Sequence, residues 1–242
     1  MQGMTFPTHV LYLHGFRSSP QSAKARFVGA WLAQHHPEVV WCCPQLPASP
    51  QQSAALMMQR VHDWPRHTMA VMGSSLGGFY ATWLAAQLGC TGVLLNPAVH
   101  PARDLANHIG EHPSWHNPED SIYFDPAFID ELKALYVGAG LKWLDATAEG
   151  ADAKRLLAVI ATGDEVLDWQ EMAARYAHAQ QHIIQGSDHG LSDFEDVWPA
   201  CWIFWQPEGS PPEPQIRSNA VRSTGGPMQL LAGDLGQAPH LD

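Results

Sequence analysis

Positive charge is scarce in this sequence. Its 242 residues include 13 Lys and Arg against 24 Asp and Glu, which gives a formal net charge of −11 at pH 7. Proteins that bind nucleic acid depend mainly on clustered Lys and Arg side chains, and no basic patch stands out along this chain. We therefore expect no nucleic-acid partner.

Long hydrophobic runs and a targeting segment are also lacking. No stretch approaches the roughly 18 apolar residues that a bilayer-spanning helix needs. The first residues, Met-Gln-Gly-Met-Thr-Phe-Pro, resemble neither the charged part nor the apolar part of a signal peptide. We therefore expect a soluble, cytoplasmic protein without a membrane partner.

Cysteine is infrequent. The four residues Cys42, Cys43, Cys90 and Cys201 all lie in apolar surroundings. Their spacing fits neither a zinc knuckle nor a disulfide framework, so we expect buried free thiols.

Histidine, in contrast, is abundant, with 14 residues. His108, His112 and His116 repeat at the spacing of one helix face, but Pro113 interrupts that register. No Cys or acidic residue completes a familiar ligand pattern around them. We predict no metal site.

Apolar segments alternate with amphipathic ones, which is typical of an α/β domain whose parallel sheet has helices on both faces. With 45% hydrophobic residues, one such domain, expected at residues 1–205, can bury a sizeable core. The predicted strands are His9–His14, Val39–Cys43, Thr68–Ser74, Gly92–Asn96, Leu156–Thr162 and His182–Gln185. The predicted helices are Ser22–His35, Pro50–Trp64, Leu76–Leu88, Pro126–Val137, Trp169–Gln180 and Asp193–Trp205. Serines before prolines, Ser19 and Ser49, mark expected helix starts.

Two regions stand apart from this alternation. Residues 97–154, rich in His and Trp, separate two predicted strands, and we expect an insertion that forms a lid or pocket wall, with a surface loop as the alternative. Residues 206–242 are dominated by Pro, Gly and small polar residues. Such a segment cannot bury enough apolar surface to offset the entropy of ordering it, so we expect a mostly disordered tail. Trp198, Trp202 and Trp205 recur at helical spacing just before it and are expected in the core.

The sequence Gly73-Ser74-Ser75-Leu76-Gly77-Gly78 follows an apolar run and leads into an Ala-rich helical stretch. This is the pattern of a nucleophile elbow, in which a strand reverses sharply into a helix and the flanking glycines prevent steric collision. Ser75 has the required glycine spacing and is the predicted nucleophile. Ser74 lacks that spacing and is expected to pack or to hydrogen-bond within the turn.

A serine nucleophile needs a base and an acid that orients the base. Asp164 follows the predicted strand Leu156–Thr162, and His189 lies on the loop before the last helix, so the order along the chain is Ser, Asp, His. Near Asp164, Glu165 is a rival and Asp168 is interpreted as a helix cap. The rival bases His178 and His182 lie before the end of the last predicted strand, on the wrong side to reach Ser75.

An acyl-transfer site also needs backbone N–H groups that stabilise an oxyanion. The residue after the nucleophile, Leu76, supplies one, and Phe16 in His14-Gly15-Phe16, after the first strand, is the candidate for the second. Gly15 allows the backbone to approach a substrate closely. His14 either takes part directly or is a strand-end residue bonded to the backbone.

Several further segments carry a family resemblance. They are Leu11-Tyr12-Leu13-His14-Gly15-Phe16, Ser18-Ser19-Pro20 with Ser22 and Lys24-Ala25, Pro44-Gln45-Leu46-Pro47, Gly73-Ser74-Ser75-Leu76-Gly77-Gly78, Asn96-Pro97-Ala98-Val99, Thr162-Gly163-Asp164-Glu165-Val166-Leu167-Asp168 and Asp188-His189. In this order, over about residues 9–205, they resemble the YqiA-like bacterial esterases. The resemblance implies an α/β-hydrolase fold, hydrolysis of carboxylic esters with short acyl chains, and no cofactor. Ser75, Asp164 and His189 fall on the family's triad positions.

The leading hypothesis is therefore a serine carboxylesterase with a small-molecule ester as substrate. A thioesterase, an acyltransferase or a C–C hydrolase could use the same triad, because fold and triad do not specify the acceptor. A non-catalytic binding protein with a hydrolase fold is the hypothesis from another class. The sequence does not indicate the oligomeric state.

Overall fold

The computed structural model describes residues 6–114, 119, 121–137 and 155–206. These residues all belong to one structural unit, Met1–Ser210, and a second unit, Pro211–Asp242, lies outside them. The tail expected at 206–242 therefore falls outside the described residues except for Gln206. Parts of the expected insertion, residues 115–118, 120 and 138–154, do so as well.

Six strands form a sheet in the order β2-β1-β3-β4-β7-β8. Every neighbouring pair is parallel, which confirms the predicted parallel sheet. The strands are β1 His9–Leu13, β2 Val40–Cys42, β3 Met69–Ser74, β4 Thr91–Leu95, β7 Leu156–Ala161 and β8 Gln180–Ile184. The chain proceeds from β1 to one edge of the sheet and from β3 toward the other. Ligands bind beyond the carboxyl ends of the strands at such a switch point, which here lies between β1 and β3.

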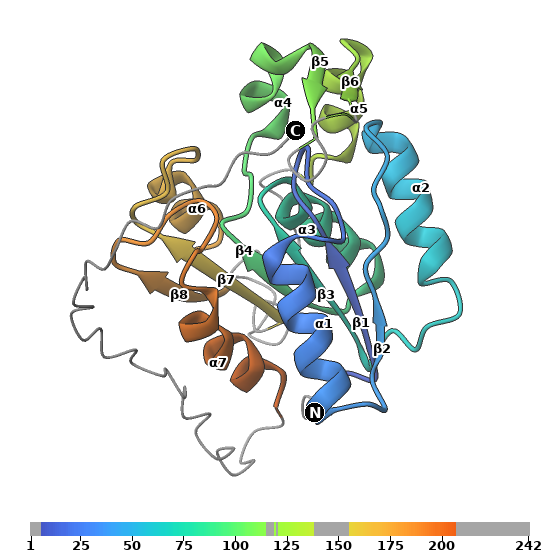
Figure 1. Ribbon diagram of the computed structural model, residues 1–242, viewed down its shortest axis with the longest axis vertical. Helices are drawn as coiled ribbons and strands as arrows, with labels where there is room; N and C mark the ends of the chain where they lie inside the picture. The colour runs from blue at the N-terminus through green and yellow to red at the C-terminus, as the bar shows by residue number, and fades with distance from the viewer. Residues whose placement is uncertain (1–5, 115–118, 120, 138–154, 207–242) are drawn as a thin grey trace, which may run out of the picture. The chain divides into compact units, whose positions relative to one another are not determined.

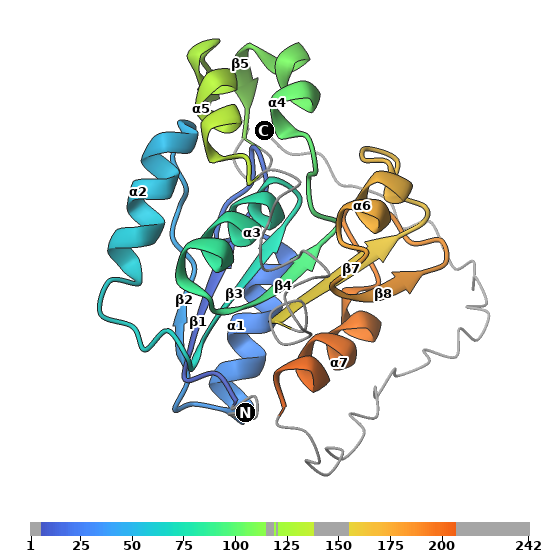
Figure 2. The same cartoon turned by 180° about the vertical axis from the view of Figure 1, so that it is seen from behind.

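Helices cover both faces of the sheet, as predicted. They are α1 Ala23–His35, α2 Pro50–Arg60, α3 Leu76–Leu88, α4 Pro101–Asp104, α5 Ala127–Leu135, α6 Trp169–Arg175 and α7 Phe194–Trp205, with a short 3₁₀ helix, η1, at Ala106–His108. Figure 1 shows α1 and α7 in front of the sheet, and Figure 2 shows α3 on the opposite face. The predicted extension of α6 to Gln180 is wrong, because Gln180 already begins β8. None of the described helices is long and apolar enough to cross a bilayer.

Polar side chains set the helix starts. Ser49 caps α2 as expected, and its hydroxyl accepts a backbone hydrogen bond from three residues further on at 3.1 Å. The expected start of α1 at Ser19 is wrong, because α1 begins at Ala23 and Ser22 is its cap. The backbone N–H of Ser22 donates to the Ser19 carbonyl, so Ser19 belongs to a turn that precedes the helix.

The sheet separates two hydrophobic cores, because successive side chains of a strand point to opposite faces. On β1, Leu11 and Leu13 join the core beneath α2, α3, α5 and α6, whereas Val10 and Tyr12 join the core beneath α1 and α7.

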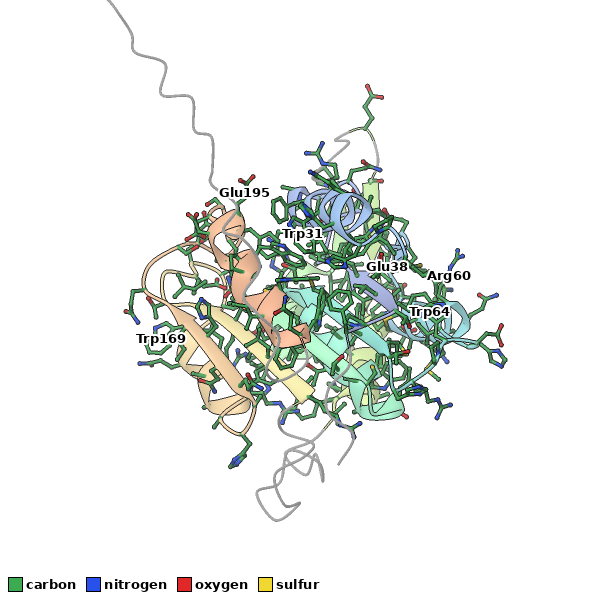
Figure 3. The ribbon with its side chains drawn as sticks, turned by 90° about the horizontal axis from the view of Figure 1, so that it is seen from below. Trp31, Glu38, Arg60, Trp64, Trp169 and Glu195 are labelled. Carbon is green, nitrogen blue, oxygen red and sulfur yellow. The ribbon has the colours of Figure 1, made fainter. Side chains whose placement is uncertain are left out.

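Tryptophans fill much of the core between α1 and α7. The expectation that Trp198, Trp202 and Trp205 lie in the core is confirmed, since all three are buried. The ring of Trp31 on α1 lies 4.3 Å from that of Trp202 and 5.1 Å from that of Trp198, measured between centroids. Figure 3 shows Trp31 on the side of α1 that faces α7.

The four cysteines are free thiols. Cys90 and Cys201 are buried as expected, and burial raises the pKa of each to about 12. The expectation of burial is wrong for Cys42 and Cys43, which are only half-buried. Cys42 ends β2, which is an edge strand of the sheet that the described residues form.

The described part of the insertion contains α4, η1, α5 and an antiparallel pair, β5 Gly110–Pro113 and β6 Ser121–Phe124. Figure 1 shows these elements together at the top of the view. The expected helix at Pro126–Val137 is present as α5. The strand pair was not predicted, because Gly-Glu-His-Pro has no alternation of apolar and polar residues. His108 lies in η1 and His112 in β5, so they do not share a helix face.

Candidate active site

Ser75 joins β3 to α3 in a backbone conformation that residues other than glycine rarely adopt. Its φ is 58° and its ψ is −121°. The turn depends on the neighbouring glycines. A Cβ atom on Gly73 would lie 2.0 Å from the Gly77 carbonyl oxygen, and one on Gly77 would lie 1.9 Å from that of Leu13. Only residues without a side chain fit both positions, which is the steric role that the sequence predicts for them.

The structure brings the hydroxyl of Ser75, the imidazole of His189 and the carboxylate of Asp164 into one hydrogen-bonded chain. His189 Nε2 lies 3.0 Å from Ser75 Oγ, and His189 Nδ1 lies 2.8 Å from Asp164 Oδ2. A carboxylate only accepts hydrogen bonds, so Nδ1 carries the proton and donates to Asp164. The lone pair of Nε2 is then directed at the Ser75 hydroxyl.

Asp164 is held firmly in the loop after β7. Its side chain is fully buried, whereas that of His189 is 20% exposed. Asp164 Oδ1 accepts two backbone N–H groups of the following turn, each at 2.8 Å. Its rivals have other partners. Glu165 accepts the backbone N–H of His189 at 3.0 Å, and Asp168 caps α6 as expected.

The rival bases are placed elsewhere. His182 lies within β8, opposite Val159 of β7, and His178 precedes that strand. The carboxyl ends of the strands carry the ligand-facing loops of such a sheet. Of these three histidines, His189, which follows the carboxyl end of β8, is the one on the side of Ser75.

The loop after β1 is oriented by His14, which is buried. The backbone N–H of Leu46 donates to His14 Nε2 at 3.0 Å, so Nδ1 carries the proton and donates to the Gly15 carbonyl oxygen at 3.0 Å. In a trans peptide the Phe16 N–H points opposite to that carbonyl. Within the described residues, the N–H groups of Phe16 and Leu76 donate to no protein acceptor. Both amides are available to a ligand, and His14 bonds to the backbone.

A cavity of about 700 Å³ lies at the carboxyl ends of β1 and β3. Ser75, His189, Phe16 and Leu76 all line it, and its volume is in the range of ligand-binding sites. The insertion contributes to its wall through Ala98, Pro101, Asp104, Leu105 and His108. This volume is large for an ester with a short acyl chain.

Asn96 is a site residue that sequence reasoning missed. It is completely buried directly after β4, with a φ of 39°. Its amide nitrogen donates to the carbonyls of Asp188 and His189 at 3.1 and 3.2 Å, and its amide oxygen accepts the N–H of Ala161 at 2.8 Å. A polar residue at the carboxyl end of a buried strand was the available signal. Its partners, more than sixty positions away in sequence, could not be inferred.

Histidines of the insertion pack against Phe16 in the loop after β1. The rings of His108 and His112 lie 5.9 and 5.8 Å from that of Phe16. Among the described residues, no group of three or more His, Cys, Asp or Glu is arranged to hold a metal ion. His116 lies outside those residues.

Comparison with solved structures defines the class of the fold. A putative hydrolase from Agrobacterium vitis S4 superposes with a TM-score of 0.61 at 16% identity, covering 83% of this chain and 91% of that one. A structure of the metagenome-derived lipolytic enzymes LipS and LipT has a TM-score of 0.60 at 16% identity, covering 84% and 95%. Mouse α/β-hydrolase domain-containing protein 10 has a TM-score of 0.59 at 15% identity, covering 84% and 90%. The chain has the α/β-hydrolase fold.

The sequence also places the chain in a family. Residues 9–206 match the uncharacterised protein family UPF0227, which is the YqiA family. The protein belongs to this family, and the resemblance inferred from its motifs is confirmed.

Proposed function

We propose that the protein is a serine esterase that hydrolyses small carboxylic esters through an acyl-enzyme. The observation that carries the proposal is the hydrogen-bonded chain from Asp164 through His189 to Ser75, which ends in a ligand-sized cavity. The metagenome-derived structure is described as lipolytic, which agrees with this chemistry on the same fold.

In the first half of the reaction, Ser75 Oγ attacks the ester carbonyl carbon while His189 Nε2 takes the hydroxyl proton. The negative charge that develops on the carbonyl oxygen is stabilised by the N–H groups of Phe16 and Leu76. Asp164 stabilises the imidazolium that forms. Collapse of the tetrahedral intermediate breaks the C–O bond, and His189 protonates the departing alcohol.

In the second half, His189 takes a proton from water, whose oxygen attacks the acyl group on Ser75. The same two N–H groups stabilise the second oxyanion. Collapse returns the proton to Ser75 and releases the carboxylic acid. Every step uses groups that line the cavity or adjoin it, and no cofactor is required.

Replacement of the proposed nucleophile tests this mechanism. We expect Ser75→Ala to lower kcat for short para-nitrophenyl esters by about 10⁴- to 10⁶-fold while the thermal unfolding midpoint stays near that of the wild type. A fluorophosphonate probe should label the wild type on Ser75. Ser74→Ala, the matched control at the neighbouring hydroxyl, should still be labelled. Unchanged ester turnover by Ser75→Ala would refute the assignment.

Product analysis separates the other uses of this triad. Faster turnover of thioesters than of matched oxygen esters would indicate a thioesterase, and acyl transfer to added alcohols would indicate an acyltransferase. A protein that neither turns over esters nor reacts with the probe would be a binding protein with a hydrolase fold.

A further inference from the structure

Lys24 is a half-buried cation in the wall of the cavity that contains Ser75. It lies in the first turn of α1, where the helix dipole is positive and a Lys side chain is unfavourable. The stability of the helix therefore gives no reason for this residue. Its position on the cavity wall suggests a role toward a ligand.

The ammonium group of Lys24 has few protein partners. It donates one hydrogen bond, to the carbonyl oxygen of Gly190, although an ammonium has three N–H donors. Within the described part of the chain, it has no ion pair with a carboxylate at 4.0 Å or less. Burial lowers the pKa of Lys24 to about 8, and Asp188 opposes that change. The Asp188 carboxylate itself is bonded to Ser192.

We propose that Lys24 binds an anionic group of the substrate, so that the preferred substrates are esters that also carry a carboxylate or a phosphate. The inference rests on the proposed esterase function. An anion in the cavity would supply the partner that the ammonium lacks and would occupy space that a short neutral ester leaves empty.

The surrounding charges fit a local anion site in an acidic protein. The net charge of −11 repels anions at long range, so attraction has to come from groups inside the cavity. Of the acidic residues of the lining, Asp104 pairs with Arg103 through Oδ1 and Glu165 accepts the N–H of His189. Asp104 Oδ2 is buried and has no hydrogen-bond partner among the described residues. The titratable and charged residues of the cavity lining are Tyr12, His14, Arg17, Lys24, Asp104, His108, Glu165 and His189.

Matched acetyl esters test the proposal on the alcohol side. Para-acetoxybenzoate, para-acetoxyphenyl phosphate and the neutral para-acetoxybenzamide form the same acetyl-enzyme and differ only in the leaving alcohol. Their kcat/KM values therefore compare binding and acylation. On the acyl side, the para-nitrophenyl monoester of adipic acid is compared with its neutral methyl ester. We expect the wild type to prefer at least one anionic ester over its neutral partner, and the preferred ester identifies the group and the side of the bond.

Variants of Lys24 then show whether the preference for the anionic ester depends on this side chain. Lys24→Met should lower the ratio of kcat/KM for the anionic ester to that for the neutral ester by about 10- to 100-fold, the usual effect of one charge-assisted hydrogen bond. Lys24→Arg, the matched control, should retain most of the ratio because it keeps the charge.

The pH dependence gives a second readout. In the wild type, the same ratio should fall as the pH rises through about 8, where Lys24 loses its proton. His189 acts on both esters alike, so its titration cancels from the ratio. Lys24→Arg should keep the ratio constant through this range.

Three outcomes overturn the inference. A wild type without preference for any anionic ester excludes an anion site. An equal loss for both esters in Lys24→Met shows that Lys24 only supports Gly190. If neutral esters are not hydrolysed and the probe does not label Ser75, the proposed function fails and the inference fails with it. Labelling and neutral turnover without a Lys24-dependent ratio refute the inference alone.

Discussion

The loops that carry Ser75 and His189 are held in place by different means. The turn at Ser75 is held by backbone groups. The N–H of Ser75 donates to the Leu95 carbonyl at 2.9 Å, and its carbonyl accepts the N–H groups of Gly78 and Ala98. Glycines permit this close approach of chain segments. The shape of the turn therefore depends on backbone hydrogen bonds and on glycines.

The loop at His189 is held by side chains from distant parts of the chain. Carbonyls of residues 188–190 accept hydrogen bonds from Asn96 and Lys24, and the N–H of His189 donates to Glu165. Residues at either side of the loop have positive φ angles of 60° and 48°, which are strained for residues other than glycine. The proposed nucleophile thus depends on close packing of backbone segments, and the proposed base depends on side chains that bind its loop.

The largest effect is expected from Gly77→Ala, which disturbs the backbone packing around the Ser75 turn. The added Cβ would lie 1.9 Å from the Leu13 carbonyl oxygen, and backbone cannot move aside cheaply. We expect a loss of more than about 4 kcal/mol in the free energy of unfolding, together with loss of ester hydrolysis. Urea denaturation measures the first and a para-nitrophenyl ester assay the second.

Gly190→Ala is the matched substitution in the His189 loop. Its Cβ would lie 3.4 Å from Asp188 Oδ1, an ordinary contact. We expect a change below about 1 kcal/mol. Equal destabilisation by both substitutions would contradict the view that the Ser75 turn depends on Gly77 more strongly than the His189 loop depends on Gly190.

A smaller effect is expected from Asn96→Asp, which changes a side chain that holds the His189 loop. The aspartate keeps the oxygen that accepts the Ala161 N–H, but it replaces the amide donor with an oxygen that faces the carbonyls of Asp188 and His189. We expect unfolding free energy to fall by about 1 to 3 kcal/mol and kcat to fall by about 10- to 100-fold, because His189 is no longer well aligned.

The pH profile separates positioning from general stability. If Asn96 positions His189, Asn96→Asp should lower kcat more than it raises KM, shift the apparent pKa of kcat/KM, and slow fluorophosphonate labelling of Ser75. A variant that loses stability but keeps the wild-type pH profile and labelling rate would show that Asn96 acts only in the fold.

The same division explains what the sequence could predict. The turn at Ser75 was predictable because Gly73, Ser75 and Gly77 encode it within five positions. Asp164 and His189 were predictable only as polar residues after buried strands, in an order that suits the proposed chemistry. The contacts of Asn96 and Lys24 with the His189 loop were not, because each is made to a carbonyl that the fold brings from 92 or more residues away.

Two candidate cap residues close together in the sequence also limited the prediction of where α1 begins. Ser19 precedes a proline and has the features of a helix cap, yet a turn intervenes and Ser22 caps α1. Among the described residues, the strands β5 and β6 pair only with each other. Burial alternates along both strands, but Gly-Glu-His-Pro does not alternate apolar with polar residues, so its sequence did not indicate a strand.

The smallest effect is expected where remote side chains meet at the surface. Arg103 of α4 forms a bidentate pair with Glu171 of α6 at 2.7 and 2.8 Å. Both side chains are well exposed. Exposed pairs contribute less than about 1 kcal/mol, so we expect Arg103→Met and Glu171→Gln each to change stability only slightly. A double-mutant cycle in urea isolates their coupling from the contact that Arg103 also makes with Asp104.

The sign of the pH dependence follows from Glu171. Hydrogen bonds from Arg103 lower the pKa of Glu171, so the folded state holds its proton less tightly than the unfolded state does. The coupling should therefore be fully present above about pH 4.3, the ordinary glutamate value, and disappear as the pH falls through the lower folded value. Added salt should weaken it at neutral pH. A coupling as large as the effect of Asn96→Asp would contradict the expectation that an exposed contact contributes less to stability than the buried contacts of Asn96. A coupling independent of pH would contradict the role given to the charge of Glu171.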